Sequence, residues 1–81
     1  METIKKIKKI ISKVLSIDES KVKEDSKMQD FLEWDSFNHL MLINEIEKEF
    51  QIELKSSQVN QVTSFQEIKY AIEKAKENEI L

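Results

Sequence analysis

Apolar residues recur at helical spacing in separate stretches of this chain, and this periodicity limits the possible folds more than any other feature of the sequence. Residues 3–16 give the clearest case, because one side of a helix there would collect Ile4, Ile7, Ile11, Val14 and Leu15. The opposite side of that helix is rich in lysine. We therefore predict an amphipathic first helix that buries its apolar side in a protein of the all-α class.

A second helix is predicted to begin at Asp35 or Ser36, where either side chain can cap free backbone N–H groups, and to end near Phe50. At about 100° per residue, one stripe of this helix contains His39, Leu42, Ile43, Ile46 and Phe50. Three further apolar residues fall outside the stripe: Phe37, Leu40 and Met41. These three are predicted to face water, which calls for a functional explanation.

The last helix is recognisable by its start, since Thr63 and Ser64 offer N-caps and Ser64 stands at capping-box spacing from Glu67. Its apolar stripe consists of Phe65, Ile68, Ile72 and Ala75. We expect the helix to fade after Ala75 into a frayed acidic end. A short helical turn at residues 56–61 is predicted to add Val59 and Val62 to the core.

The connection between the first two helices is long, because residues 17–35 lose the helical periodicity and are dominated by Asp, Ser, Lys and Glu. Loops of this length are uncommon in small domains and tend to be functional. We expect a short turn near residues 18–21, and we expect the loop to be anchored to the core by Val22, Met28, Phe31 and Leu32. Three longer helices, a short third helix and this long first loop predict a four-helix bundle. The 81 residues suffice for a single domain spanning 1–81.

Composition excludes several classes of protein. There is no cysteine and only one histidine, so a disulfide framework, a thiolate metal site and an ordinary zinc site are excluded. The net charge of -3 argues against a nucleic-acid-binding protein, and no apolar run approaches the roughly 20 residues that cross a bilayer. We expect a cytoplasmic protein without stable membrane insertion. We expect the lysine side chains of the first helix to be solvated. Alternatively, a basic amphipathic helix could contact an anionic membrane or another protein.

Ser36 admits three interpretations. It and Asp35 could simply cap the second helix, as such residues commonly do. A hydrolase using Asp35, Ser36 and His39 is disfavoured, because the chain has no G-x-S-x-G elbow and too few residues for a closed pocket. In the third interpretation Ser36 is modified, since backbone N–H groups and the helix dipole favour a phosphate at a helix N-terminus. The exposed Phe37, Leu40 and Met41 would then form a docking surface.

A resemblance favours the third interpretation. The stretch Phe31-Leu32-Glu33-Trp34-Asp35-Ser36-Phe37, followed by Leu42, Ile46, Glu47, Glu49, Phe50 and Leu54, resembles the signature of acyl carrier proteins. The resemblance implies a bundle of the acyl-carrier-protein type in which Ser36 receives 4′-phosphopantetheine from coenzyme A and Asp35 belongs to the recognition motif. It also implies that Phe37 and Met41 face partners, and we predict further partner contacts by Trp34, Leu40 and Glu47. The cargo channel would be lined by His39, Leu42, Ile46, Val59 and Val62.

The function implied by the resemblance is that of a carrier rather than an enzyme. A phosphopantetheinyl transferase would modify Ser36, an activating ligase would load an acyl or aminoacyl group as a thioester, and an acyltransferase or synthase would receive it. We expect a monomer. The second helix is less acidic than that of fatty-acid carriers, having Asn38, Met41 and Lys48, and Trp34 and His39 flank the Asp-Ser pair. These features resemble dedicated carriers of specialised bacterial pathways, such as surface polysaccharide or natural-product assembly.

Three alternatives remain open at the level of sequence. The main rival function is an unmodified helical interaction module that binds a partner through Phe37, Leu40 and Met41. Trp34 is read either as a packing residue that closes the loop over the bundle or as a partner contact beside the arm. His39 is read either as a hydrogen-bonded core residue or as a polar group that disfavours long apolar cargo.

Overall fold

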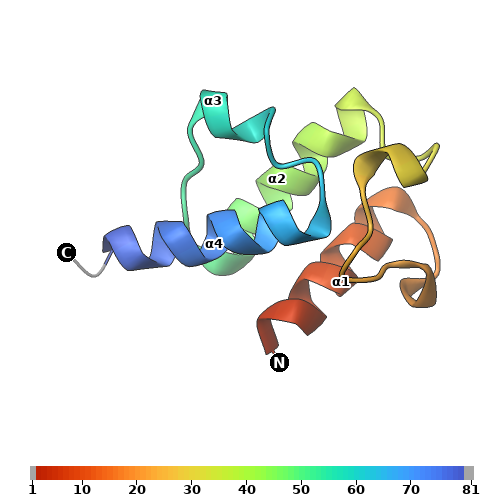
Figure 1. The fold of residues 1–81 in the computed structure, drawn as a ribbon, viewed down its shortest axis with the longest axis horizontal. Coiled ribbons are helices and arrows are strands. Elements are labelled where there is room, and N and C mark those ends of the chain that lie inside the picture. Colours follow the sequence, from red (N-terminus) through yellow and green to blue (C-terminus); the bar gives the residue numbers. More distant parts are fainter. Residues whose placement is uncertain (1, 80–81) are drawn as a thin grey trace.

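A computed structural model describes residues 2–79, with side chains to residue 76, and within that range every regular element is helical. The elements in chain order are α1 (Glu2–Leu15), the 3₁₀ turns η1 (Glu19–Lys21) and η2 (Met28–Asp30), α2 (Ser36–Phe50), α3 (Ser56–Val59) and α4 (Phe65–Glu79). Helix α1 packs against both α2 and α4. Figure 1 shows the short α3 on the far side of the molecule from the start of α1. The predicted all-α four-helix bundle with a long first loop is confirmed.

A single cluster of buried apolar side chains holds the helices together. It is built from the predicted stripes: Ile7, Ile11 and Leu15 of α1, Leu42, Ile43, Ile46 and Phe50 of α2, and Phe65, Ile68 and Ile72 of α4, with Val62 from the segment before α4. Burial of such stripes is the main favourable term in assembling a bundle of this size. The periodicity therefore identified most of the core.

Helices α1 and α2 both end with a residue in the left-handed conformation, Ser16 at φ 56° and Gln51 at φ 54°. At each end the next N–H reaches back to the last turn, from Ile17 to the Ser12 carbonyl (3.0 Å) and from Ile52 to the Glu47 carbonyl (3.1 Å). Glycine usually occupies such positions, but this chain contains none. These two helix ends are therefore made by residues that carry a Cβ atom, at a cost in backbone strain.

The long loop is tied to the entry of α4. The Met28 N–H donates to the Thr63 carbonyl (2.8 Å), and the Phe65 N–H donates to the Ser26 carbonyl (2.9 Å). These two bonds flank an antiparallel bridge between Lys27 and Ser64. These bonds fix the position of the loop relative to α4. Because the loop leads directly into α2, they also help to position the start of α2.

Three details of the structure differ from the predictions. Leu32 does not anchor the loop, because its side chain is 99% exposed; Val22 is buried there, and Met28 and Phe31 are half-buried against the core. The turn η2 was not predicted, since the sequence has no apolar periodicity there. Helix α4 does not fade after Ala75 but continues to Glu79, because no helix breaker interrupts the segment. Residues 80 and 81 lie outside the described range.

Candidate functional site

Asp35 and Ser36 have different roles at the start of α2. Asp35 is the N-cap, and its Oδ1 accepts a hydrogen bond from the Asn38 N–H (2.9 Å). Ser36 is the first helical residue and is exposed. Within the described chain its hydroxyl forms no hydrogen bond, so the interpretation of Ser36 as a cap is wrong. The backbone N–H groups at this helix start have no carbonyl within the helix to pair with.

A small pocket of about 210 Å³ opens beside Ser36. Its lining comes from the long loop, the first turn of α2 and the α3–α4 connection: Met28, Ser36, His39, Leu40, Asn60 and Thr63. The meeting of Met28, Asn60 and Thr63 there was not predicted from the sequence, because they come from separate segments; the bond from the Met28 N–H to the Thr63 carbonyl joins two of them. The pocket mixes apolar and hydrogen-bonding side chains.

His39 is buried behind this pocket and both of its ring nitrogens are hydrogen-bonded. The Trp34 indole Nε1–H lies 3.0 Å from His39 Nδ1, and His39 Nε2 lies 2.7 Å from the Val59 carbonyl oxygen. An indole N–H can only donate, so Nδ1 is the acceptor and the ring proton resides on Nε2, which donates to Val59. The interpretation of His39 as a hydrogen-bonded core residue is confirmed.

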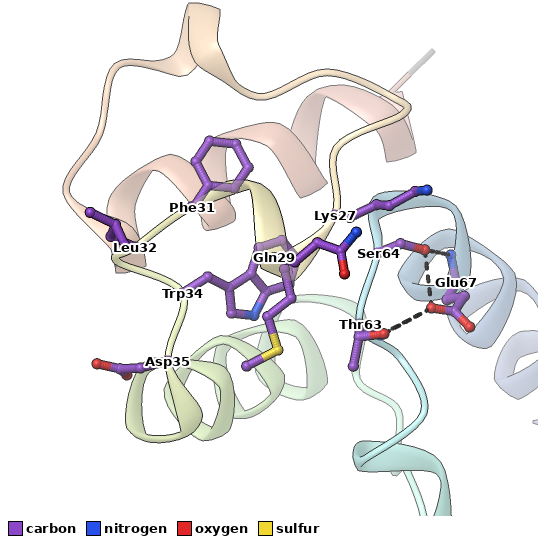
Figure 2. Close-up of a pocket in the computed structure, with 10 residues that line it drawn as sticks. Lys27, Gln29, Phe31, Leu32, Trp34, Asp35, Thr63, Ser64 and Glu67 are labelled. Carbon is purple, nitrogen blue, oxygen red and sulfur yellow. Dashed lines mark hydrogen bonds between the residues drawn. The ribbon is translucent and has the colours of Figure 1, made fainter.

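Trp34 is a packing residue. Its side chain is 3% exposed, its ring stacks on that of His39 at 6.2 Å between centroids, and Phe31 lies 6.3 Å away on the same measure. Burial leaves the indole little surface for another protein, and the partner contact of Trp34 stays a prediction. Figure 2 shows the indole turned inward while Leu32 and Asp35 project outward.

The remaining predicted channel residues lie in a closed core. Leu42 and Ile46 are fully buried and Val62 is almost so, whereas Val59 is half-buried. Neither Leu42 nor Ile46 lines the pocket beside Ser36. Of the five predicted channel residues, only His39 borders the pocket beside Ser36.

An exposed apolar surface lies on α2 next to Ser36, as the helical spacing predicts. Phe37 is 70% exposed, Leu40 61% and Met41 46%. Leu32 extends this apolar exposure onto the preceding loop, although the sequence had suggested that it was buried. The exposure of Phe37, Leu40 and Met41 agrees with the predicted docking surface, and their contact with partners stays a prediction.

The acidic residues of α2 are largely engaged within the chain. Glu47 Oε2 accepts from the Leu54 N–H (2.8 Å), which fixes the segment after α2. Glu49 lies 3.4 Å from the Lys6 ammonium and Glu45 lies 3.7 Å from that of Lys13, both on α1. Because Oε2 of Glu47 is engaged in this bond, a partner would meet mainly the other carboxylate oxygen, Oε1. The predicted partner contact of Glu47 stays a prediction.

A wider groove of about 710 Å³ shares Met28 and Thr63 with the pocket beside Ser36 and extends from Trp34 and Asp35 to the start of α4 (Figure 2). At its far end the Glu67 carboxylate accepts from the Thr63 N–H (3.2 Å) and from the Ser64 hydroxyl (3.1 Å). The Glu67 N–H donates in turn to Ser64 Oγ (3.2 Å), which confirms the predicted capping interaction. Within the described chain no cluster of three or more His, Cys, Asp or Glu residues could hold a metal ion.

Comparison with known proteins places this chain in a family. The profile of the family described as phosphopantetheine attachment site matches residues 5–71. The acyl carrier protein of Thermotoga maritima is 34% identical over 73 residues, which cover 90% of each chain. The chain belongs to the acyl carrier protein family. The acyl carrier protein of Buchnera aphidicola subsp. Schizaphis graminum is 40% identical over 62 residues, covering 76% of this chain and 78% of the relative.

A solved structure supports the same fold. The solution NMR structure of the holo acyl carrier protein from Geobacter metallireducens aligns with a TM-score of 0.83, covering 99% of this chain and 92% of that one. At 19% identity this likeness concerns the fold alone.

Family membership confirms several of the sequence predictions. An acyl carrier protein is a carrier and not an enzyme, and it carries acyl groups on a 4′-phosphopantetheine prosthetic group. It works with a phosphopantetheinyl transferase and with biosynthetic enzymes. In residues 2–79 no helix is both long enough and apolar enough to span a membrane. The comparisons thus favour a carrier over an unmodified interaction module.

Proposed function

We propose that Ser36 is the attachment site of the phosphopantetheine group, and that this chain carries acyl or aminoacyl intermediates in a specialised bacterial pathway. The observation that carries the proposal is the exposed, unbonded hydroxyl of Ser36 directly after the cap residue Asp35, within the matched residues 5–71. When bound, the group supplies a terminal thiol that forms thioesters, which explains how a chain without cysteine can carry acyl groups.

The residues at the start of α2 fit a phosphodiester. Asp35 and Ser36 are both exposed, and Asp35 uses its Oδ1 to accept from the Asn38 N–H. The N–H groups of the first turn that Asp35 does not cap, together with the helix dipole, favour a negative phosphate at this position. In the modification, Ser36 Oγ loses its proton and bonds to the β-phosphorus of coenzyme A. The diphosphate bond breaks and adenosine 3′,5′-bisphosphate leaves.

The surface of α2 supports dedicated partners. Two of its acidic side chains, Glu45 and Glu49, are paired with lysines of α1, and Glu47 is bonded to the Leu54 N–H. An enzyme that docks through a basic patch would therefore find few free carboxylates on this helix. The exposed Phe37, Leu40 and Met41 offer an apolar contact instead. We propose that an activating ligase and an acyltransferase or synthase of one pathway bind there, in the cytoplasm, to a monomeric carrier of a single domain.

Modification with coenzyme A and a promiscuous phosphopantetheinyl transferase tests the attachment site. Intact mass should increase by one phosphopantetheine on the wild type and stay unchanged on Ser36→Ala. The matched control is Ser56→Ala, because Ser56 is also an exposed serine at the first position of a helix, and it should be modified like the wild type. An adduct on Ser36→Ala, or a wild type that resists modification while correctly folded, would contradict the proposal and favour the unmodified interaction module.

A further inference from the structure

His39 joins three segments of the chain within reach of Ser36. Trp34 ends the long loop, His39 lies one turn into α2 and Val59 ends α3. The Trp34 indole N–H, the His39 imidazole and the Val59 carbonyl are linked by hydrogen bonds of 3.0 and 2.7 Å. We call these three groups the histidine clasp. It connects α2 to α3 on one side and to the loop on the other.

Of the histidine clasp, His39 is the member that lines the pocket beside Ser36. His39 is the buried residue of α2 nearest to Ser36, and Leu42 and Ile46 follow it on the same face of the helix. A group that passes from the pocket toward these core residues must move past His39. Separating α3 from α2 to make room would break the bond between His39 Nε2 and the Val59 carbonyl.

Breaking that bond has a different cost for different cargo. An alkyl chain would leave a buried imidazole N–H and a half-buried carbonyl without partners, which is unfavourable in apolar surroundings. The pocket itself, at about 210 Å³, is smaller than the roughly 300–1,000 Å³ of typical ligand pockets. Asn60 and Thr63 place hydrogen-bonding side chains at its wall. The pocket thus suits a short acyl group that carries a hydroxyl, amide or amino substituent.

We propose that the histidine clasp keeps the core closed to long apolar cargo, and that this carrier transports short acyl groups with a hydrogen-bonding substituent, seated beside Ser36. His39 is thus a specificity-determining residue and Trp34 is a positioning residue that orients its ring. The inference rests on the proposed attachment at Ser36.

The test loads the wild-type protein from octanoyl-coenzyme A and from 3-hydroxybutyryl-coenzyme A with the promiscuous transferase, and confirms each product by intact mass. We expect the melting temperature of the octanoyl form to lie within about 2 °C of that of the protein carrying phosphopantetheine without an acyl group. The indole N–H signal of Trp34, the chain's only tryptophan, should keep its NMR position in the octanoyl form. The 3-hydroxybutyryl form should shift the amide signals of Asn60 and Thr63.

Variants separate specificity from stability. His39→Leu removes both ring nitrogens, and its octanoyl form should melt about 4–8 °C above its own unacylated form. His39→Gln keeps a side-chain N–H that can reach toward Val59, so it should restore most of the wild-type behaviour. The matched control is Ile43→Val, which shortens a buried side chain of α2 that does not line the pocket. It should lower the melting temperatures of the octanoyl form and of the unacylated form by the same amount.

Two results would overturn the inference. One is a wild-type octanoyl form that is stabilised as strongly as that of His39→Leu, and the other is a displaced Trp34 indole signal in the wild-type octanoyl form. If His39→Leu does not fold, the wild-type indole signal decides alone. A wild type that gains no mass would instead overturn the attachment at Ser36, so the two failures are read by different measurements.

Discussion

At the scale of single residues, the functional differences among these side chains depend on their hydrogen bonds. Asp35 and Ser36 are neighbours with similar capping ability, yet only Asp35 caps α2, and the Ser36 hydroxyl forms no hydrogen bond to any described residue. His39 and Trp34 satisfy each other's polar atoms inside the core. Buried polar groups in proteins are almost always hydrogen-bonded, and Trp34 and His39 meet this requirement through each other. At the start of α2, by contrast, one of two adjacent polar side chains makes the capping bond.

Asp18 shows the same effect on a carboxyl group of the long loop. Its Oδ1 accepts from the Ser20 N–H and from the Ser20 hydroxyl, each at 2.9 Å. These bonds, the backbone one first, hold the pKa of Asp18 below its ordinary value of 3.8. Because the pKa is depressed in the folded state, this carboxylate contributes stability above pH 3.8 and loses the contribution as pH falls through the folded value.

Replacing Ser20 tests this assignment. Ser20→Ala removes the hydroxyl donor and keeps the stronger N–H donor, so the pKa of Asp18 should rise only part of the way toward 3.8. NMR titration of the Asp18 carboxyl measures the change, and Ser57→Ala, an exposed serine of α3, serves as the control. An unchanged Asp18 titration in Ser20→Ala would show that the hydroxyl plays no part.

At the scale of elements, the helix ends carry a strain that this glycine-free composition imposes. Gln51 sits at φ 54° with its N–H bonded to the Glu47 carbonyl, a conformation that glycine adopts without a Cβ clash. The same helix begins with a good cap, so its two ends are unequal. The left-handed end nevertheless directs the chain toward Leu54, whose N–H the Glu47 carboxylate binds.

We expect Gln51→Gly to raise the free energy of unfolding by about 0.5–1 kcal/mol, since relief of the left-handed strain exceeds the added entropy of the unfolded chain. Urea denaturation measures the difference. Gln61→Gly is the matched control, because Gln61 is an exposed glutamine outside the positive-φ residues, and it should destabilise the protein. Destabilisation by both variants would show that the end of α2 is not strained.

At the scale of the whole molecule, one core connects the helices and the site. Ile46 is fully buried in the same cluster that contains Trp34, so the tryptophan beside Ser36 reports on the state of the entire bundle. The ion pairs between α1 and α2 are too exposed to add more than about 0–1 kcal/mol each. The global stability therefore depends on apolar packing, and the domain should unfold as a unit.

Ile46→Ala tests this cooperativity. It should lower the free energy of unfolding by about 2–5 kcal/mol, because it leaves a cavity in a small core. Urea transitions followed by helical circular dichroism and by Trp34 fluorescence should coincide in the wild type and move together in the variant. Met41→Ala, which alters an exposed side chain of the same helix, should change stability by about 0.5 kcal/mol or less. Separated transitions would contradict a single cooperative core.

The sequence alone was sufficient for the helices, most of the core and the exposed apolar residues beside Ser36. Helical periodicity and capping depend on residues three or four positions apart, so Leu42, Ile46, Ser64 and Glu67 could be interpreted without the fold. The resemblance to acyl carrier proteins rested on a motif of the same local kind, and the comparisons confirmed the family.

Only the tertiary structure decided which of these side chains are available to partners. The burial of Trp34, the exposure of Leu32 and the engagement of Glu47 depend on how the long loop and the segment after α2 pack. The bond from His39 to Val59 spans 20 residues, and the pocket beside Ser36 needs three separate segments. Such contacts are set by chain topology and loop geometry, which no local pattern of residues records.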